Sequence, residues 1–193
     1  MKVACVNKAG YLTCVRIFAL PLGLLAISFA AGAQTRAVAD GVAHVSNSFS
    51  FTVPASLHEA APLFGPEAER SWAGTEWNPQ FLFPLPGKDV EGAVFTVQHG
   101  EHRSVWVNTR FDLEAGRMQY VVVLPDLLVS RIDVALHAID ATHTRVDVTY
   151  VRTALRPEAN EHVVAMGRHD RAQGPEWERS IKTYLATQRG VPR

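Results

Sequence analysis

Apolar and polar residues alternate along much of the chain with the period of two that marks a half-buried β-strand. The first such segment is residues 42–53, which Pro54 ends. Five further segments are rich in Val, Ile, Thr and aromatic residues and are separated by short turns: residues 92–99, 104–113, 117–124, 129–139 and 145–155. Successive strands with short connections predict an antiparallel meander.

The faces of two of these strands can be assigned from the alternation. The apolar rows are Ile132, Val134 and Leu136 in one strand and Val146, Val148 and Tyr150 in the other. We expect these rows to face inward and to give a mostly apolar interior. The charged rows between them include Arg131, Asp133 and His137, and Arg110 and Asp112 alternate in the same way on an earlier strand. These side chains could serve acid–base chemistry, but we expect them on the solvated face.

Helical signals flank the strands. Ser56, with Glu59 three residues later, predicts a capping box at the start of a short helix, and a second short helix is expected at residues 67–72. Residues 157–167 predict a helical turn or an irregular excursion. After residue 175, four apolar residues recur at helical spacing and predict an amphipathic C-terminal helix: Trp177, Ile181, Tyr184 and Leu185.

These elements predict an α+β fold. A curved antiparallel sheet of about six to seven strands should wrap around the long C-terminal helix, because each has one apolar face to bury. The two short helices after the first strand should close one end.

The N-terminal residues have the features of a secretory signal peptide. Lys2, Lys8 and Arg16 precede an almost wholly apolar run at residues 17–30, and residues 31–33 are small, as a signal-peptidase site requires. The apolar run is shorter than the ~20 residues of a membrane-spanning helix. We expect residues 1–33 to be removed near Ala33 and residues 34–41 to form a mobile leader. The mature protein should then be secreted, into the periplasm, without stable membrane insertion.

Cleavage would change the thiol content and the charge. Cys5 and Cys14 are the two cysteines, so the mature chain would have no thiol and no disulfide. The full chain has 19 basic and 19 acidic residues, and the loss of three basic residues leaves a formal charge of −3. This charge argues against nucleic acid as a partner.

Patterns for catalysis or metal binding are weak. No G-x-S-x-G elbow surrounds any serine, and no cysteine remains for a thiol enzyme. His99 and His102 flank Gly100 and Glu101 in a predicted turn, but they lack the spacing of a helical ligand pair. We interpret this turn as a solvated hairpin. We expect no metal and no cofactor, and we assign no catalytic residue.

Residues 70–84 form a turn-rich connector with two Trp and two Phe. Large rings are too abundant here for an ordinary solvated loop, so they should cover either a second layer of the core or the opening of a pocket. The candidate ligand-binding residues are aromatic: Trp72, Trp77, Phe81, Phe95, Trp106, Tyr120 and Tyr150. The alternative for each is ordinary core, which we favour for Trp177.

Several short segments occur in a recognisable order: Phe64-Gly65-Pro66, Glu69-Arg70 through Trp72, Trp77-Asn78-Pro79-Gln80-Phe81, Glu91-Gly92-Ala93-Val94-Phe95, Val148-Thr149-Tyr150, Thr153-Ala154-Leu155 and Trp177-Glu178. Together they resemble the START-like superfamily (SRPBCC), also called the polyketide cyclase and birch-pollen-allergen-like group. The resemblance spans residues 42–185 and implies a START-like domain at residues 42–189 with the helix-grip fold. In that superfamily the final helix and the sheet commonly enclose a cavity for an apolar small molecule or lipid.

The resemblance and the aromatic connector predict that the protein binds a small hydrophobic molecule or lipid between the C-terminal helix and the sheet. One alternative is a cyclase-, aromatase- or hydrolase-type enzyme that uses the same cavity, which would need ionisable side chains inside it. A second is a ligand-free interaction module, in which the connector aromatics would form an exposed apolar patch. Because no catalytic motif of the enzymatic members matches this chain, we favour the binding protein.

Signal cleavage predicts the N-terminus of the exported protein. Its intact mass should correspond to a chain that starts at Gln34, and its stability should not respond to reductant because Cys5 and Cys14 are gone. Mass spectrometry of the protein from a periplasmic extract checks both the cleavage site and the compartment. Full-length chain in the membrane fraction would contradict the expectation.

Overall fold

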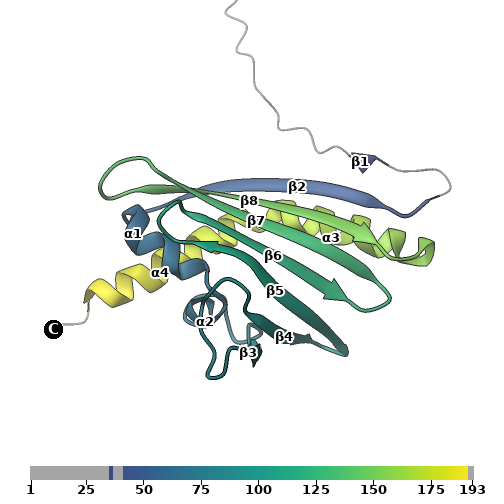
Figure 1. The fold of residues 1–193 in the computed structure, drawn as a ribbon. Helices are drawn as coiled ribbons and strands as arrows, with labels where there is room; N and C mark the ends of the chain where they lie inside the picture. The colour runs from purple at the N-terminus through teal and green to yellow at the C-terminus, as the bar shows by residue number, and fades with distance from the viewer. Residues whose placement is uncertain (1–34, 37–40, 191–193) are drawn as a thin grey trace, which may run out of the picture. The chain divides into compact units, whose positions relative to one another are not determined.

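A curved antiparallel sheet, with two helices lying against one face, makes up most of the structure (Figure 1), a computed structural model that describes residues 35–36 and 41–190. The expected signal peptide and most of the expected leader lie outside the described residues. The strands are β1 (Thr35–Arg36), β2 (His44–Val53), β3 (Gln80–Phe83), β4 (Val94–His99), β5 (His102–Asp112), β6 (Arg117–Leu124), β7 (Leu128–Ala138) and β8 (Thr144–Ala154). Their order in the sheet is β1-β2-β8-β7-β6-β5-β4-β3. The predicted meander is therefore confirmed, and β2 joins it by pairing with β8.

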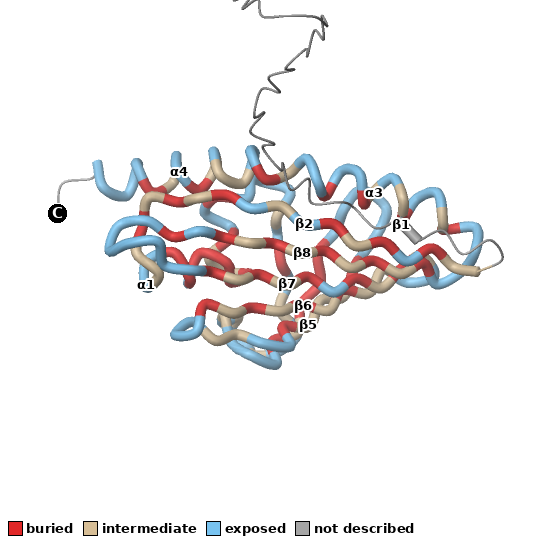
Figure 2. The backbone as a smooth tube through the Cα atoms, turned by 90° about the horizontal axis from the view of Figure 1, so that it is seen from above, coloured by how far each residue is buried: buried red, intermediate tan, exposed pale blue. Residues whose placement is uncertain are grey.

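Burial alternates along the strands as the sequence predicts (Figure 2). The inward rows of β7 and β8 are buried, from Ile132 to Leu136 and from Val146 to Tyr150. The opposite face carries exposed or half-buried ion pairs, with Arg131 Nε 2.8 Å from Asp133 Oδ2. The charged rows thus lie on the solvated face, away from the core.

Three short helices follow β2, and two longer ones end the described chain. The short ones are α1 (Leu57–Ala60), the 3-10 helix η1 (Ala61–Phe64) and α2 (Pro66–Glu69). The capping box of Ser56 and Glu59 is present at the start of α1. After the 3-10 turn η2 (Pro157–Ala159) come α3 (Asn160–Ala172) and α4 (Gly174–Gly190). The apolar face of α4 is as predicted, with Ile181 and Leu185 buried in the main core. Among the described residues, no helix has the length and apolar character needed to cross a membrane.

Three sequence-based expectations need correction. The connector contains β3, a four-residue strand paired with β4, and residues 157–167 belong to η2 and the regular 13-residue helix α3. The second short helix also ends at Glu69 and does not reach Trp72. Glycine explains the close approach of α3 to the sheet, because a Cβ at Gly167 would lie 2.7 Å from Asn47 Nδ2 on β2.

A buried polar row crosses the interior under α3. Arg152 of β8 and Asp170 of α3 are 8% and 2% exposed and form a bidentate pair, with N–O distances of 2.7 and 2.6 Å. Arg152 also donates to Ser130 Oγ at 2.8 Å and lies over the ring of Tyr150. This row separates the main core under α4 from a smaller cluster under α3. The ion pair therefore ties α3 to the sheet.

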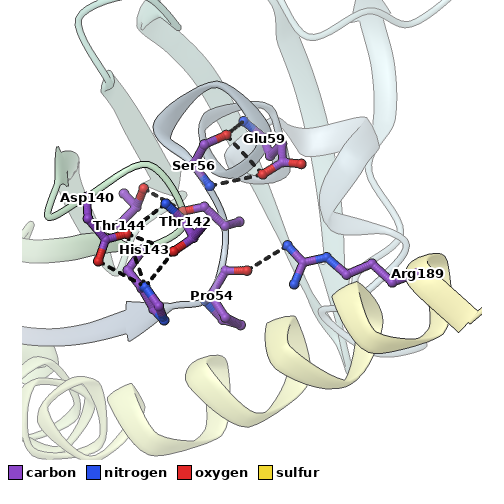
Figure 3. A network of polar contacts seen from close by, with 9 residues as sticks. Pro54, Ser56, Glu59, Asp140, Thr142, His143, Thr144 and Arg189 are labelled. Atoms are coloured by element: carbon purple, nitrogen blue, oxygen red, sulfur yellow. Dashed lines mark hydrogen bonds and ion pairs between the residues drawn. The ribbon is translucent and has the colours of Figure 1, made fainter.

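The far end of α4 is fixed to the turn after β2 (Figure 3). Arg189 Nη2 donates to the carbonyl of Pro54 at 2.7 Å, and Thr144 Oγ1 donates to Ala55 O at 2.9 Å. The helix is thus held to the sheet both by its apolar face and by its last turn.

Removing one partner of the buried ion pair should destabilise the protein strongly. We expect Asp170→Asn to lower the free energy of unfolding by about 3 to 5 kcal/mol, because it leaves the guanidinium of Arg152 buried without a counter-charge. The double variant Arg152→Met/Asp170→Leu should cost less than the two single changes together, and Arg145→Met, which breaks an exposed pair with Asp147, should cost at most about 1 kcal/mol. Urea unfolding measures all of them. Equal losses in the Asp170 and Arg145 variants would contradict this role.

Candidate ligand cavity

A cavity of about 790 Å³ lies between the inner face of the sheet, the helices α3 and α4, and the segment that follows α2. Its apolar lining comes from strand residues that the alternation turns inward, including Val122, Ile132 and Val134. Its volume is in the range of small-molecule sites.

Six aromatic rings line the cavity: Trp72, Trp77, Trp106, Tyr120, Tyr150 and Trp177. The four tryptophans contact one another in pairs, edge to face, with ring centroids 5.2 Å apart for Trp77 and Trp106 and 5.4 Å apart for Trp72 and Trp177. Such contacts hold the rings in fixed orientations.

The N–H of every tryptophan is already bonded within the protein. Trp72 and Trp77 donate to the carbonyls of Leu63 and Pro66 at 2.7 and 2.8 Å. Trp106 donates to Ser104 Oγ at 2.8 Å, and Trp177 donates to Gln173 Oε1 at 2.9 Å. The tryptophans therefore offer a ligand ring surface and no free N–H donor.

The candidate residues from the sequence divide into two layers. Trp72, Trp77, Trp106, Tyr120 and Tyr150 line the cavity. Phe95 is fully buried behind it, with its centroid 5.7 Å from Trp106 and 5.5 Å from Phe81, and neither Phe95 nor Phe81 is a lining residue. Trp177, expected in the core, lies at the boundary: it lines the cavity and also packs on Phe49 of β2.

Glu69, the last residue of α2, brings a carboxyl group into the lining. It is 9% exposed, and no hydrogen bond or ion pair among the described residues involves its carboxyl oxygens. Burial, and then the negative charge of Asp89, raise the pKa of Glu69 well above its usual range. Asp89 itself is held by the backbone N–H groups of Glu67 and Ala68, at 2.7 and 3.1 Å. Glu69 is thus an acid without a partner among the described residues, and its surroundings disfavour the charged form.

Two tyrosine hydroxyls lie near this acid but differ in their bonding. Tyr120 donates to the carbonyl of Phe64. For Tyr150, no hydrogen bond of the hydroxyl is found within the described part of the chain. Burial raises the pKa of both tyrosines, and the charge of Glu69 raises both further. All three residues line the cavity.

The lining is more polar than the sequence predicts. Besides Glu69, the Arg152–Asp170 pair lies at the α3 end, so the expectation of a mostly apolar interior is wrong there. Arg152 follows Val148 and Tyr150 at the spacing that turns side chains inward, so the alternation contained this signal. Nothing comparable marks Glu69, since a four-residue helix is too short to show a periodic face.

Exposed histidines surround the opening. They are His99 and His102 on the β4–β5 hairpin, and His162 and His169 on α3. In the described ranges, no three His, Cys, Asp or Glu side chains gather as a metal site would require. The hairpin histidines are solvated, as expected, but they also border the cavity.

Comparisons of sequence and of structure give different results. No protein-family model matches the sequence, and no curated protein sequence matches it. Several solved structures match over most of the chain. Norcoclaurine synthase from Thalictrum flavum, in complex with dopamine and hydroxybenzaldehyde, superposes with a TM-score of 0.55 at 10% identity, covering 79% of this chain and 91% of that one. Ara h 8.0201 gives a TM-score of 0.52 at 15% identity, with coverages of 75% and 99%.

The chain has the helix-grip fold, which it shares with these solved structures. CalU16 from Micromonospora echinospora matches as well, with a TM-score of 0.50 at 16% identity over 84% of each chain. At such low identities the START-like likeness shows the fold alone.

The pKa shift of Glu69 predicts a pH-dependent effect of its replacement. Because its pKa is raised in the folded protein, stability falls as the pH rises above the unfolded pKa of about 4.3, and the loss is complete above the folded pKa. Glu69→Gln resembles the protonated acid. The free energy of unfolding of this variant should equal that of the wild type near pH 4 and exceed it at pH 8. The difference at pH 8 should be about 1.4 kcal/mol for each unit by which folding raises the pKa of Glu69 between these two pH values. Urea unfolding across this range tests it, with Glu158→Gln on the surface as the control. A pH-independent difference would refute the raised pKa.

Proposed function

We propose that this protein binds a small hydrophobic molecule with an aromatic or similarly flat body in the cavity between its sheet and its C-terminal helices. The observation that carries the proposal is the 790 Å³ space lined by six aromatic rings. The fold gives further support, because the similar norcoclaurine synthase is described in complex with two aromatic small molecules, dopamine and hydroxybenzaldehyde.

The binding energy would come from enclosure. A ligand that buries roughly 300 Å² of apolar surface gains roughly 7 kcal/mol at about 25 cal/mol per Å², and lost freedom of the ligand offsets part of this. The lining needs little reorganisation when a ligand binds, because contacts between the rings and the hydrogen bonds of the tryptophan N–H groups already fix the positions of the rings. Export to the periplasm, which the N-terminal residues suggest, would place this binding outside the cytoplasm.

An acid–base enzyme is the second candidate, and Glu69 is the observation that favours it. A carboxyl group with a raised pKa inside an apolar cavity can donate or accept a proton at neutral pH. The interaction module has weaker support. Leu82, Phe83 and Leu85 of the connector are exposed, but they do not account for the cavity.

A matched pair of substitutions tests whether the cavity binds ligands. Val122 lines the cavity, whereas Val148 is fully buried in the core and does not. We expect the fluorescence of N-phenyl-1-naphthylamine to rise on binding to the wild type, and Val122→Trp to weaken this binding several-fold while changing stability by less than about 1 kcal/mol. Val148→Trp should instead destabilise the fold by about 1 to 3 kcal/mol or more, because it overpacks a filled region.

The outcomes separate the candidate functions. No fluorescence response from the wild type, together with equal destabilisation by both substitutions, would mean that the space is not a ligand site. Molecules extracted from the purified protein should be recovered unchanged after incubation with it if the protein only binds them. Their conversion by the wild type, but not by Glu69→Gln, would favour the enzyme.

A further inference from the structure

The charges that line the cavity are unevenly distributed. Its described lining contains four acids, Glu69, Glu76, Asp170 and Glu176, and only one arginine or lysine, Arg152. The guanidinium of Arg152 is already engaged by Asp170 and Ser130. The lining therefore offers no free permanent cation to pair with an anionic ligand.

Glu69 is the acid best placed to act on a ligand. Asp170 is neutralised by Arg152, and Glu76 and Glu176 are exposed at the opening. Glu69 alone is about nine-tenths buried, lines the cavity and has no partner among the described residues. A buried carboxyl group without a partner is costly unless a ligand supplies one.

The tryptophan rings in the same cavity lining suit a cation. Trp72, Trp77 and Trp106 use their N–H groups elsewhere in the protein, so the ligand meets their π-systems. The faces of such rings attract ammonium groups, most strongly where water is excluded. An aromatic enclosure with one carboxyl group is thus complementary to an apolar molecule that carries a basic nitrogen.

We propose that the ligand class is an organic amine with an apolar body, whose ammonium group pairs with the carboxylate of Glu69 against the tryptophan rings. This inference rests on the proposed binding function and gives it a substrate class. The charged groups that act on Glu69 are limited: Asp89 opposes its ionisation, and Tyr120 and Tyr150 are neutral neighbours. Binding of an ammonium ion would restore the missing counter-charge and favour the carboxylate form, so any protonated Glu69 would lose its proton to solvent as the amine enters.

Three ligands with one naphthyl body test the charge preference: 2-(2-naphthyl)ethylamine, 2-(2-naphthyl)ethanol and 3-(2-naphthyl)propanoate. Calorimetric titration of the wild type at pH 7 should show the amine binding at least about tenfold more tightly than the alcohol, and the propanoate most weakly. Repeating the amine titration in buffers of different ionisation enthalpy should show proton release.

Glu69→Gln should bring the amine close to the affinity of the alcohol, leave alcohol binding unchanged and abolish the proton release. Glu69→Met serves as a second variant if the glutamine form does not fold. Glu158→Gln, on the surface and outside the cavity lining, should change amine affinity less than threefold. An amine that binds no better than the alcohol, or a Glu69→Gln effect equal for all three ligands, would overturn the amine assignment while leaving the binding function intact. If no compound binds to the wild type, the binding function itself fails.

Discussion

The ion pair of Arg152 and Asp170 is the interaction on which the arrangement of the interior depends. Two charges this deeply buried are tolerable only when paired in good geometry, so the position of α3 on the sheet is fixed to within a hydrogen-bond length. Apolar packing alone would allow a helix to slide or rotate. The ion pair holds α3 on the sheet, and Arg189 in the last turn of α4 holds that helix to Pro54. The helices therefore cannot move into the space between themselves and the sheet, and the cavity does not collapse.

The aromatic wall shows how a protein can keep an internal space open. Each of the four tryptophan rings is restrained twice, by edge-to-face contacts and by a hydrogen bond from its indole N–H, and two of the acceptors are carbonyls of the short helices. Filling the cavity by inward movement of Trp72 or Trp77 would break these bonds. The short helices thus act as anchors for the wall as well as an end cap.

Most of the fold follows from local patterns in the sequence. Alternation locates six of the strands, the Ser56 capping box marks α1, and the spacing of Ile181 and Leu185 gives the buried face of α4. The two elements that the sequence did not predict, β3 and α3, lack a local pattern for physical reasons. β3 is short and half-exposed, so it has no alternating pattern, and its pairing with β4 is a long-range effect that local propensity cannot reveal. α3 has few apolar residues, because part of its inner face is Gly167 and Asp170.

The site was partly accessible from sequence for the same reasons. The high aromatic content of the connector indicated several of the rings that line the cavity. Extending the alternation of β8 by two residues beyond Tyr150 would also have placed Arg152 in the interior. Whether a ring lines a space or lies one layer behind it depends on tertiary packing: Trp106 lines the cavity and its cross-strand partner Phe95 does not, although the two rings are 5.7 Å apart. The inward placement of Glu69 depends on where a four-residue helix docks, and no local pattern encodes that.

The form of β3 has a consequence for the protein in a crowded compartment. A long, regular edge strand invites pairing with other chains and eventual aggregation. Here the edge strand has only four residues, its register with β4 shifts between Phe81 and Phe83, and Pro84 and Pro86 follow at once, neither of which can donate a backbone hydrogen bond. The sheet can therefore leave its apolar edge residues Leu82 and Phe83 exposed without offering a template for intermolecular β-structure.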